Sequence, residues 1–204
     1  MAYVYIYRLT SDTGFAPCVE GNLLTLACCK GGQMRGDKVI NTGLRYRIGA
    51  QKDVKWDEED VYIVGTYKDK FLYLARVTKV ITMEEYYSGL SKGRMDDIYS
   101  FKKGELVRNN KLRDKINHNH GVHTESDRVI KDLAGKYVIM SNDYIYLGED
   151  AVYDDVIVKY NPKFQETKKY AGEEADIIIN ACKKHKTKDI HIPNEPYKKK
   201  GCCR

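Results

Sequence analysis

The stretch VYIVGTYKDKFLYLARVTKVI, residues 61–81, is the strongest local signal for the fold. Its two apolar runs flank TYKDK, a connection of the length usual in β-hairpins, so the stretch predicts two antiparallel strands. Because side chains alternate between the two faces of a strand, we expect Phe71, Tyr73, Ala75 and Val77 to share one face of the second strand.

A short helix is predicted directly after this hairpin. Thr82 is a favourable N-cap, and Glu85 three residues later completes a capping box. The helical run MEEYYSGLS should end near Gly89 or Gly93. The sequence therefore predicts one short helix embedded among strands.

Further strands are predicted at short runs rich in apolar and aromatic residues. The segments 44–60 and 93–128 are charged or irregular and are predicted to be loops. A C-terminal helix is expected over about 173–185, because Ala175, Ile178, Ile179 and Cys182 lie at helical spacing. The predicted strands are 3–9, 22–29, 38–41, 136–141 and 144–148, with DDVIVKY at 154–160 as a candidate for one more.

The order of these elements lacks the regular strand–helix alternation of a doubly wound fold. The fold class predicted is α+β, built on a curved antiparallel or mixed sheet or a small barrel, with the short embedded helix and the C-terminal helix. A chain of 204 residues suits one domain, which we expect over 1–182. Residues 186–204 are predicted to form a basic tail.

Charge is distributed unevenly along the chain. Residues 183–204 contain eight Lys and Arg against Asp189 and Glu195, which leaves 27 basic and 27 acidic residues in the body. A body without a net basic excess disfavours strong non-specific binding of duplex DNA. The basic tail remains a candidate contact for nucleic acid, with a solvated end as the alternative.

Composition also bounds the environment of the chain. No run approaches the roughly 18 apolar residues of a membrane span, and the N-terminus does not have the pattern of a signal peptide. We therefore expect a cytoplasmic protein with no membrane partner, whose six cysteines are reduced thiols. The 17 tyrosines suit half-buried strands.

Several familiar kinds of site are disfavoured by motif. The cysteines lack the paired C-x-x-C spacing of a structural zinc site, and the glycines form neither a P-loop nor G-x-G-x-x-G. The run HNHGVH contains His118, His120 and His123, which leaves open a loop without function, a catalytic or base-contacting histidine, or a metal site. We predict no metal, and no cofactor can be assigned from these residues.

A series of motifs, in this order, resembles the nucleotide modification associated domain 2 family. The resemblance covers roughly residues 3–151 and leaves the last 50 residues outside it. The motifs are the tyrosine-rich first strand, GFAP, TLACCK, GDKVINTG, YLARVTKVITMEEYY, DDIY, a histidine before SDRVI, and VIMSNDYIYLGED.

The resemblance implies a nucleotide- or DNA-base-directed protein that is associated with base modification in a phage or bacterial setting, and modification of the nucleotide is the activity that it suggests. Its location would be the host cytoplasm if a phage encodes it. The partner implied is a nucleotide or a modified nucleobase. The alternative is a non-catalytic binder that reads a modified base or sequesters a nucleotide signal in phage–host conflict, and a structural adaptor without a small ligand is a third possibility.

Site residues are assigned on the matching positions. His123 is the predicted acid or base, assisted by Asp96 or Asp127. The predicted ligand-binding residues are Phe15 and Tyr99 at the base, Lys30 and Arg76 at phosphate, and Pro17 as the residue that shapes the loop. We expect the region of Phe15 and Pro17 and the region of His123 to fold against each other around a cavity that accommodates a nucleobase.

Overall fold

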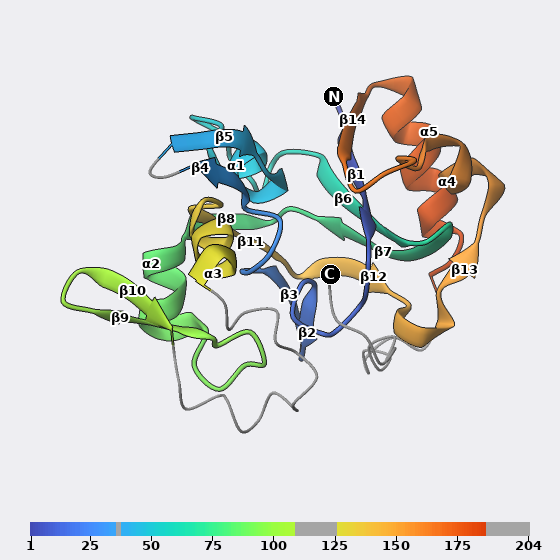
Figure 1. Ribbon diagram of the computed structural model, residues 1–204. Coiled ribbons are helices and arrows are strands. Elements are labelled where there is room, and N and C mark those ends of the chain that lie inside the picture. The colour runs from blue at the N-terminus through green and yellow to red at the C-terminus, as the bar shows by residue number, and fades with distance from the viewer. Residues whose placement is uncertain (36–37, 109–125, 187–204) are drawn as a thin grey trace.

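The structure is a computed structural model, and it describes residues 1–35, 38–108 and 126–186. The chain is a mixed α+β fold, and no sheet formed by these residues closes into a barrel. Of the two predicted architectures, the open mixed sheet is therefore the observed one (Figure 1).

The largest sheet has the strand order β12-β7-β6-β1-β14, with β13 also paired to β7. Strands β1 and β6 are parallel, and the other pairs in this sheet are antiparallel. The bounds are β1 Tyr3–Leu9, β6 Val61–Tyr67, β7 Lys70–Arg76, β12 Asp143–Tyr146, β13 Val152–Tyr153 and β14 Thr167–Ala171. The predicted hairpin of residues 61–81 thus supplies two central strands of this sheet.

A second, antiparallel sheet has the order β2-β3-β11-β8, and two further hairpins lie beside it. The bounds are β2 Cys18–Glu20, β3 Leu23–Leu26, β8 Lys79–Thr82 and β11 Tyr137–Ser141, with hairpins β4 Gly32–Arg35/β5 Lys38–Thr42 and β9 Tyr99–Lys102/β10 Glu105–Arg108. The helices are α1 Leu44–Gly49, α2 Met83–Glu85, α3 Ser126–Leu133, α4 Asp155–Tyr160 and α5 Glu173–Lys183, with a π-helical turn η1 at Tyr86–Leu90 and a 3-10 turn η4 at Gly148–Asp150.

Three hydrophobic clusters hold these layers together. One lies between the two large sheets and α1 and includes Tyr5, Tyr7, Leu26 and Ile48. A second lies between the largest sheet and the pair α4 and α5, which cover its other face in Figure 1. The third packs the outer face of the four-stranded sheet against α2, η1 and the start of β9.

The capping box at Thr82 and the C-terminal helix are confirmed. The Thr82 side chain accepts a hydrogen bond from the Glu85 backbone N–H, and the Glu85 carboxylate accepts one from the Thr82 backbone N–H. Helix α5 buries Ala175 and Cys182 against the largest sheet, together with the two isoleucines predicted to share that face.

Of the four residues predicted to share one face of β7, all but Phe71 do so, but Leu72, which alternation places on the opposite face, also lies in the cluster between the sheets. Tyr73, Ala75 and Val77 lie in the cluster between the sheets, but Phe71 lies in the cluster under α5. The register of β6 and β7 shifts between Gly65 and Thr66, which leaves one extra residue on β7 and inverts the alternation beyond it.

Three loop or strand predictions are wrong. Residues 44–49 form α1, because Leu44 and Ile48, one helical turn apart, are both buried. The predicted strand at 154–160 is instead α4, whose N-terminus is capped by the Asp154 carboxylate through the N–H groups of residues 156 and 157. Within 93–128, residues 99–108 form the hairpin β9–β10, and α3 begins at 126.

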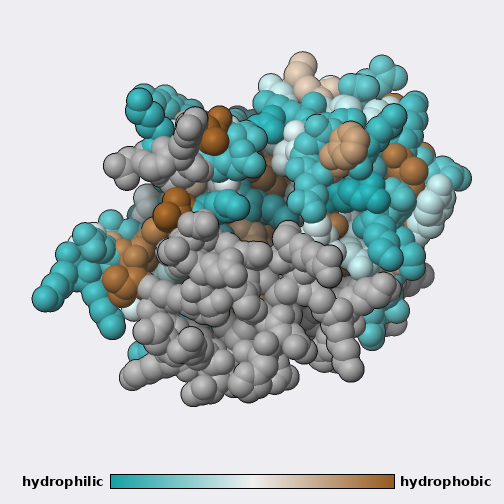
Figure 2. Space-filling view, viewed as in Figure 1, coloured by the Kyte–Doolittle hydropathy of each residue, from teal (hydrophilic) through white to brown (hydrophobic). Residues whose placement is uncertain are grey.

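The described surface is mainly hydrophilic over β14, α4 and α5 (Figure 2). No helix in the described residues is both long enough and apolar enough to span a bilayer. The predicted basic tail, apart from its first residue, lies outside the described residues.

Candidate functional site

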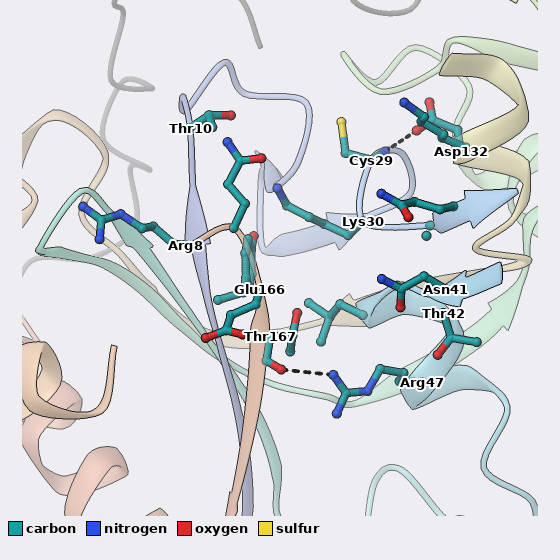
Figure 3. Close-up of a pocket in the computed structure, with 18 residues that line it drawn as sticks. Arg8, Thr10, Cys29, Lys30, Asn41, Thr42, Arg47, Asp132, Glu166 and Thr167 are labelled. Carbon is teal, nitrogen blue, oxygen red and sulfur yellow. Dashed lines mark hydrogen bonds between the residues drawn. The ribbon is translucent and has the colours of Figure 1, made fainter. Parts of the chain in front are cut away.

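A polar cavity of about 590 Å³ opens between the edge of the largest sheet and the β4–β5 hairpin. It is lined by the end of β1, the segment 29–33, the end of β5, the start of α1, two residues of α3, and residues 165–167. Its volume lies within the roughly 300–1,000 Å³ typical of small-molecule sites. Figure 3 shows Lys30 extending into the space between β1 and the β4–β5 hairpin.

The wall that presents Lys30 is an unusual turn. Cys29 and Lys30 have φ angles of 55° and 50°, a left-handed conformation that is uncommon for residues other than glycine. The turn is fixed from two sides, because the Cys29 N–H donates to Asp132 Oδ1 at 2.6 Å and the Lys30 carbonyl accepts from the Arg45 N–H at 3.2 Å. A strained turn that is held this firmly directs one side chain reproducibly.

Arg45 is the central support of this wall. Its side chain is completely buried, and its guanidinium donates to three backbone carbonyls, those of Cys29 and Tyr137 at 2.7 Å and that of Asp132. A Cβ added to Gly135 would lie 2.4 Å from Arg45 Cζ, so the guanidinium needs a glycine at that position. One buried cation therefore ties the 29–31 turn to α3 and β11.

Glycines also bring the backbones of the wall close together. A Cβ at Gly31 would lie 1.9 Å from the carbonyl oxygen of Lys131, and a Cβ at Gly43 would lie 2.2 Å from that of Lys30. The Gly43 N–H donates to the Gly31 carbonyl at 3.1 Å. These glycines of the G-rich segment therefore serve close packing of the cavity wall.

Two cations of the cavity rest on aromatic rings. Lys30 Nζ lies 4.9 Å from the centroid of the Tyr7 ring, and the Arg47 guanidinium lies 5.8 Å from that of Tyr5. Arg47 also donates to the Thr167 carbonyl at 3.1 Å, as Figure 3 shows. Among the described residues, neither cation forms an ion pair with a carboxylate. Because a ring leaves the charge of a cation uncompensated, both remain available to an anion.

The acidic residues of the cavity are engaged elsewhere. Asp132 accepts hydrogen bonds from the Cys29 N–H and from the Tyr99 hydroxyl, the latter at 2.9 Å. Glu166 lies 3.9 Å from the ammonium of Lys168. Arg8 also lines the cavity, but its guanidinium points away in Figure 3 and pairs with Asp69 at 3.3 Å.

The phenol of Tyr7 is part of the buried floor. Its hydroxyl lies 2.8 Å from that of Tyr73, and burial, reinforced by Tyr73, raises the pKa of Tyr7 well above its usual value of 10. Tyr7 is therefore a neutral hydrogen-bonding group at physiological pH and cannot act as a base there. Cys28 behaves similarly, because a hydrogen bond with Cys29 and burial raise the pKa of its thiol. Cys29 is half-buried and lines the cavity.

The structure brings some predicted residues to the cavity. Lys30 lines it, and Tyr99 supports the same wall through its hydrogen bond to Asp132. Phe15 is 4% exposed and shares the third hydrophobic cluster with Tyr99, and Pro17 is also buried, after a cis peptide bond. In this structure the Phe15 and Tyr99 rings therefore pack in the core.

Other predicted residues lie elsewhere. Asp96 is completely buried in a cluster with Thr25, Tyr86 and Arg94: it accepts hydrogen bonds from the threonine and tyrosine hydroxyls and pairs with the guanidinium at 3.4 Å. Burial raises the pKa of Asp96 above 3.8, against these contacts. Arg76 pairs with Asp143 at 3.1 Å, between β7 and β12, and does not line the cavity.

His123, the predicted acid or base, lies outside the described residues, and so do His118 and His120. Asp127 is in α3, but its side chain is not among those described. Within the described ranges, no group of three or more His, Cys, Asp or Glu is placed to hold a metal ion.

Sequence reasoning missed Tyr7, Arg45, Arg47 and Asp132. A signal for Tyr7 existed in the alternation of tyrosines at 3, 5 and 7, which places all three on one face of a strand. Arg45 and Arg47 lie in the segment 44–60 that is predicted as a loop, and Asp132 lies in 129–135, for which no element is predicted. Nothing in the sequence context of these three residues distinguishes them from solvated charges.

Comparison with family models places the whole described body within one family. The model for nucleotide modification associated domain 2 matches residues 1–198, well beyond the 3–151 expected from the motifs. The chain therefore belongs to the nucleotide modification associated domain 2 family. No curated protein and no solved structure matched the chain.

Proposed function

We propose that this chain binds a nucleotide in the polar cavity, with the phosphate at Lys30 and Arg47, as part of nucleotide or DNA-base modification. The observation that carries the proposal is the pairing of both cations with tyrosine rings instead of carboxylates. The family supports it at a coarser level, since its description associates the domain with nucleotide modification.

The physical case is one of charge and preorganisation. A buried arginine and close-packed glycines hold the Lys30 turn, so little ordering entropy is lost when an anion binds. The exposed amides and hydroxyls of Gln33, Asn41 and Thr42 line the same cavity and offer hydrogen bonds to sugar or base. A phosphate is the group that this combination of cations and polar donors suits best.

Catalysis remains a prediction that rests on His123 and Asp127. Asp127 precedes Asp132 by five residues on α3, which is about 7.5 Å along a helix axis. The helix that supplies part of the cavity wall thus also carries the predicted acidic residue. His123 lies three residues before the first residue of α3 in sequence.

Calorimetric titration with deoxynucleoside mono-, di- and triphosphates tests the proposal. Lys30→Ala should weaken binding about tenfold or more, because a charge-assisted hydrogen bond to phosphate contributes roughly 1.5–3 kcal/mol. Lys92→Ala, at an exposed lysine that does not line the cavity, is the matched control. If no nucleotide binds, or if both variants bind like the unmodified protein, the cavity is not the nucleotide site.

Mass spectrometry of the incubated nucleotide separates an enzyme from a binder. A change in nucleotide mass that disappears in His123→Ala, with binding retained, supports catalysis by His123. A nucleotide recovered unchanged from the denatured protein supports the alternative of a non-catalytic binder that sequesters or reads the nucleotide.

A further inference from the structure

Strand β1 carries a row of three tyrosines, each beneath a cation. Tyr3, Tyr5 and Tyr7 alternate with residues of the opposite face, and all three pack on the cluster between the sheets. Lys169 Nζ lies 4.2 Å from the centroid of the Tyr3 ring and 5.5 Å from that of Tyr5. With Arg47 over Tyr5 and Lys30 over Tyr7, the three cations and the three rings form what we call the β1 ladder.

The ladder is assembled from three separate parts of the chain. Lys30 comes from the strained turn, Arg47 from α1, and Lys169 from β14, the edge strand, where it stands opposite Tyr5. Within the described ranges, none of the three cations pairs with a carboxylate. Arg47 and Lys169 are exposed, whereas Tyr5 and Tyr7 are 3% and 2% exposed. The rings of Tyr5 and Tyr7 therefore position cations and are not themselves available for stacking with a base.

The spacing of the tyrosines is regular. Successive tyrosines are two residues apart, so the rings repeat about every 6.6–6.8 Å along the strand. A row of positive charges along one strand, without carboxylate partners among the described residues, is complementary to the phosphates of a single polynucleotide strand. A single mononucleotide in the cavity would engage only the end of this row, at Lys30 and Arg47.

We infer that the β1 ladder continues the cavity as a track for a single polynucleotide strand, so that the ligand of this protein is a nucleotide within a strand. This inference rests on the proposed function, because it assigns the first phosphate to Lys30. A single strand fits better than a duplex, because the track is one line of cations on a body with equal numbers of acidic and basic residues over 1–182.

An acidic run of the chain adjoins the far end of the ladder. The acidic run 57–60 is exposed, and the Asp60 carbonyl accepts a hydrogen bond from the Tyr3 N–H at 2.8 Å. A strand that continued past Tyr3 would meet these carboxylates. The track therefore accommodates only about as many phosphates as it has cations, and affinity should stop rising with strand length after a few nucleotides.

The test is a titration of the full chain with 5′-phosphorylated oligothymidylates of one, two, four and eight nucleotides, at 50–400 mM NaCl. Affinity should rise up to about four nucleotides and then level off. Lys169→Ala should weaken the affinity for the four-nucleotide strand about five- to tenfold at 50 mM NaCl. It should also reduce the slope of log affinity against log salt by about 0.7, the value for one phosphate contact on a single strand. It should leave mononucleotide binding unchanged, and Lys169→Arg should retain strand binding.

Lys92→Ala is again the matched control, since Lys92 is an exposed lysine that does not line the cavity and lies outside β1 and β14. The inference is overturned if Lys169→Ala leaves the affinity for the strand unchanged, or if it lowers the affinities for the mononucleotide and for the strand equally. In either case, mononucleotide binding that still depends on Lys30 preserves the proposed function. Mononucleotide binding that is indifferent to Lys30→Ala overturns the proposed function and, with it, the track.

Discussion

Replacement of Arg45 by methionine should be among the most damaging single changes to the cavity wall. Methionine keeps much of the length of the side chain but removes the charge and every donor. Three buried carbonyls, those of residues 29, 132 and 137, then lose the guanidinium. Because Arg45 is completely buried, water cannot replace it without a rearrangement of the wall.

The magnitude follows from these three bonds. Hydrogen bonds from a charged donor contribute roughly 1.5–3 kcal/mol each. Part of that sum is offset, because methionine does not carry the desolvation cost of a buried cation. We therefore expect Arg45→Met to lower the free energy of unfolding by about 4 kcal/mol. For a chain of this size, the corresponding fall in Tm is about 8–16 °C.

Urea denaturation followed by circular dichroism measures this loss. An m-value equal to that of the unmodified protein would show that the variant and the unmodified protein unfold from equally compact states. Arg47→Met is the matched control, because Arg47 is exposed on the same helix and donates to one carbonyl. It should cost less than about 1 kcal/mol. Arg45→Lys should recover only part of the loss, since an ammonium cannot reproduce the planar fork of donors. A loss below about 1 kcal/mol for Arg45→Met would refute the role assigned to the buried guanidinium.

Three further changes test other parts of the structure. Gly31→Ala places a Cβ 1.9 Å from a backbone oxygen of α3, so it should lower Tm and abolish nucleotide binding in calorimetry. Gly89→Ala is the control, because a Cβ there has nothing within 4 Å, and it should change neither. Equal effects of the two variants would contradict the close packing at Gly31. Thr82→Ala should cost about 1 kcal/mol in urea denaturation through loss of the capping box, and an unchanged midpoint would argue against it. Burial pushes the pKa of Asp154 up, but hydrogen bonds from His185 and two backbone N–H groups outweigh burial and hold the pKa below 3.8. Asp154 therefore stabilises the fold above pH 3.8, and this contribution is lost as pH falls through its lowered pKa. Asp154→Asn should lower stability at pH 6–7 and flatten the acid limb of the stability profile; an acid limb as steep as before would exclude Asp154 as its source.

In the 11–30 region, the sequence predicts that Phe15 contacts a base and that Lys30 contacts phosphate. Lys30 lines the cavity, but the Phe15 ring lies in the core beside Tyr99, because the outer face of the four-stranded sheet needs large side chains to cover it. An aromatic residue in a turn carries the same sequence signal whether its ring is buried or faces a ligand.

Local patterns were sufficient where a local interaction decides the structure. The hairpin of residues 61–76 follows from two apolar runs and a short polar connection. The start of the embedded helix follows from the reciprocal hydrogen bonds of Thr82 and Glu85, and helix α5 follows from its apolar stripe. Each of these depends on residues within a few positions of one another, so the sequence alone determined them.

Only the tertiary structure decided the cavity and the β1 ladder. Lys30, Arg47 and Lys169 are brought to one strand by a turn, a helix and an edge strand that are distant in sequence. In the sequence, nothing distinguishes Arg45 from the other charged residues of its polar segment. In the structure, its guanidinium donates to three carbonyls from separate parts of the chain. The physical reason is that a charge acquires its role from the groups that surround it, and here those groups come from elements that are distant along the chain.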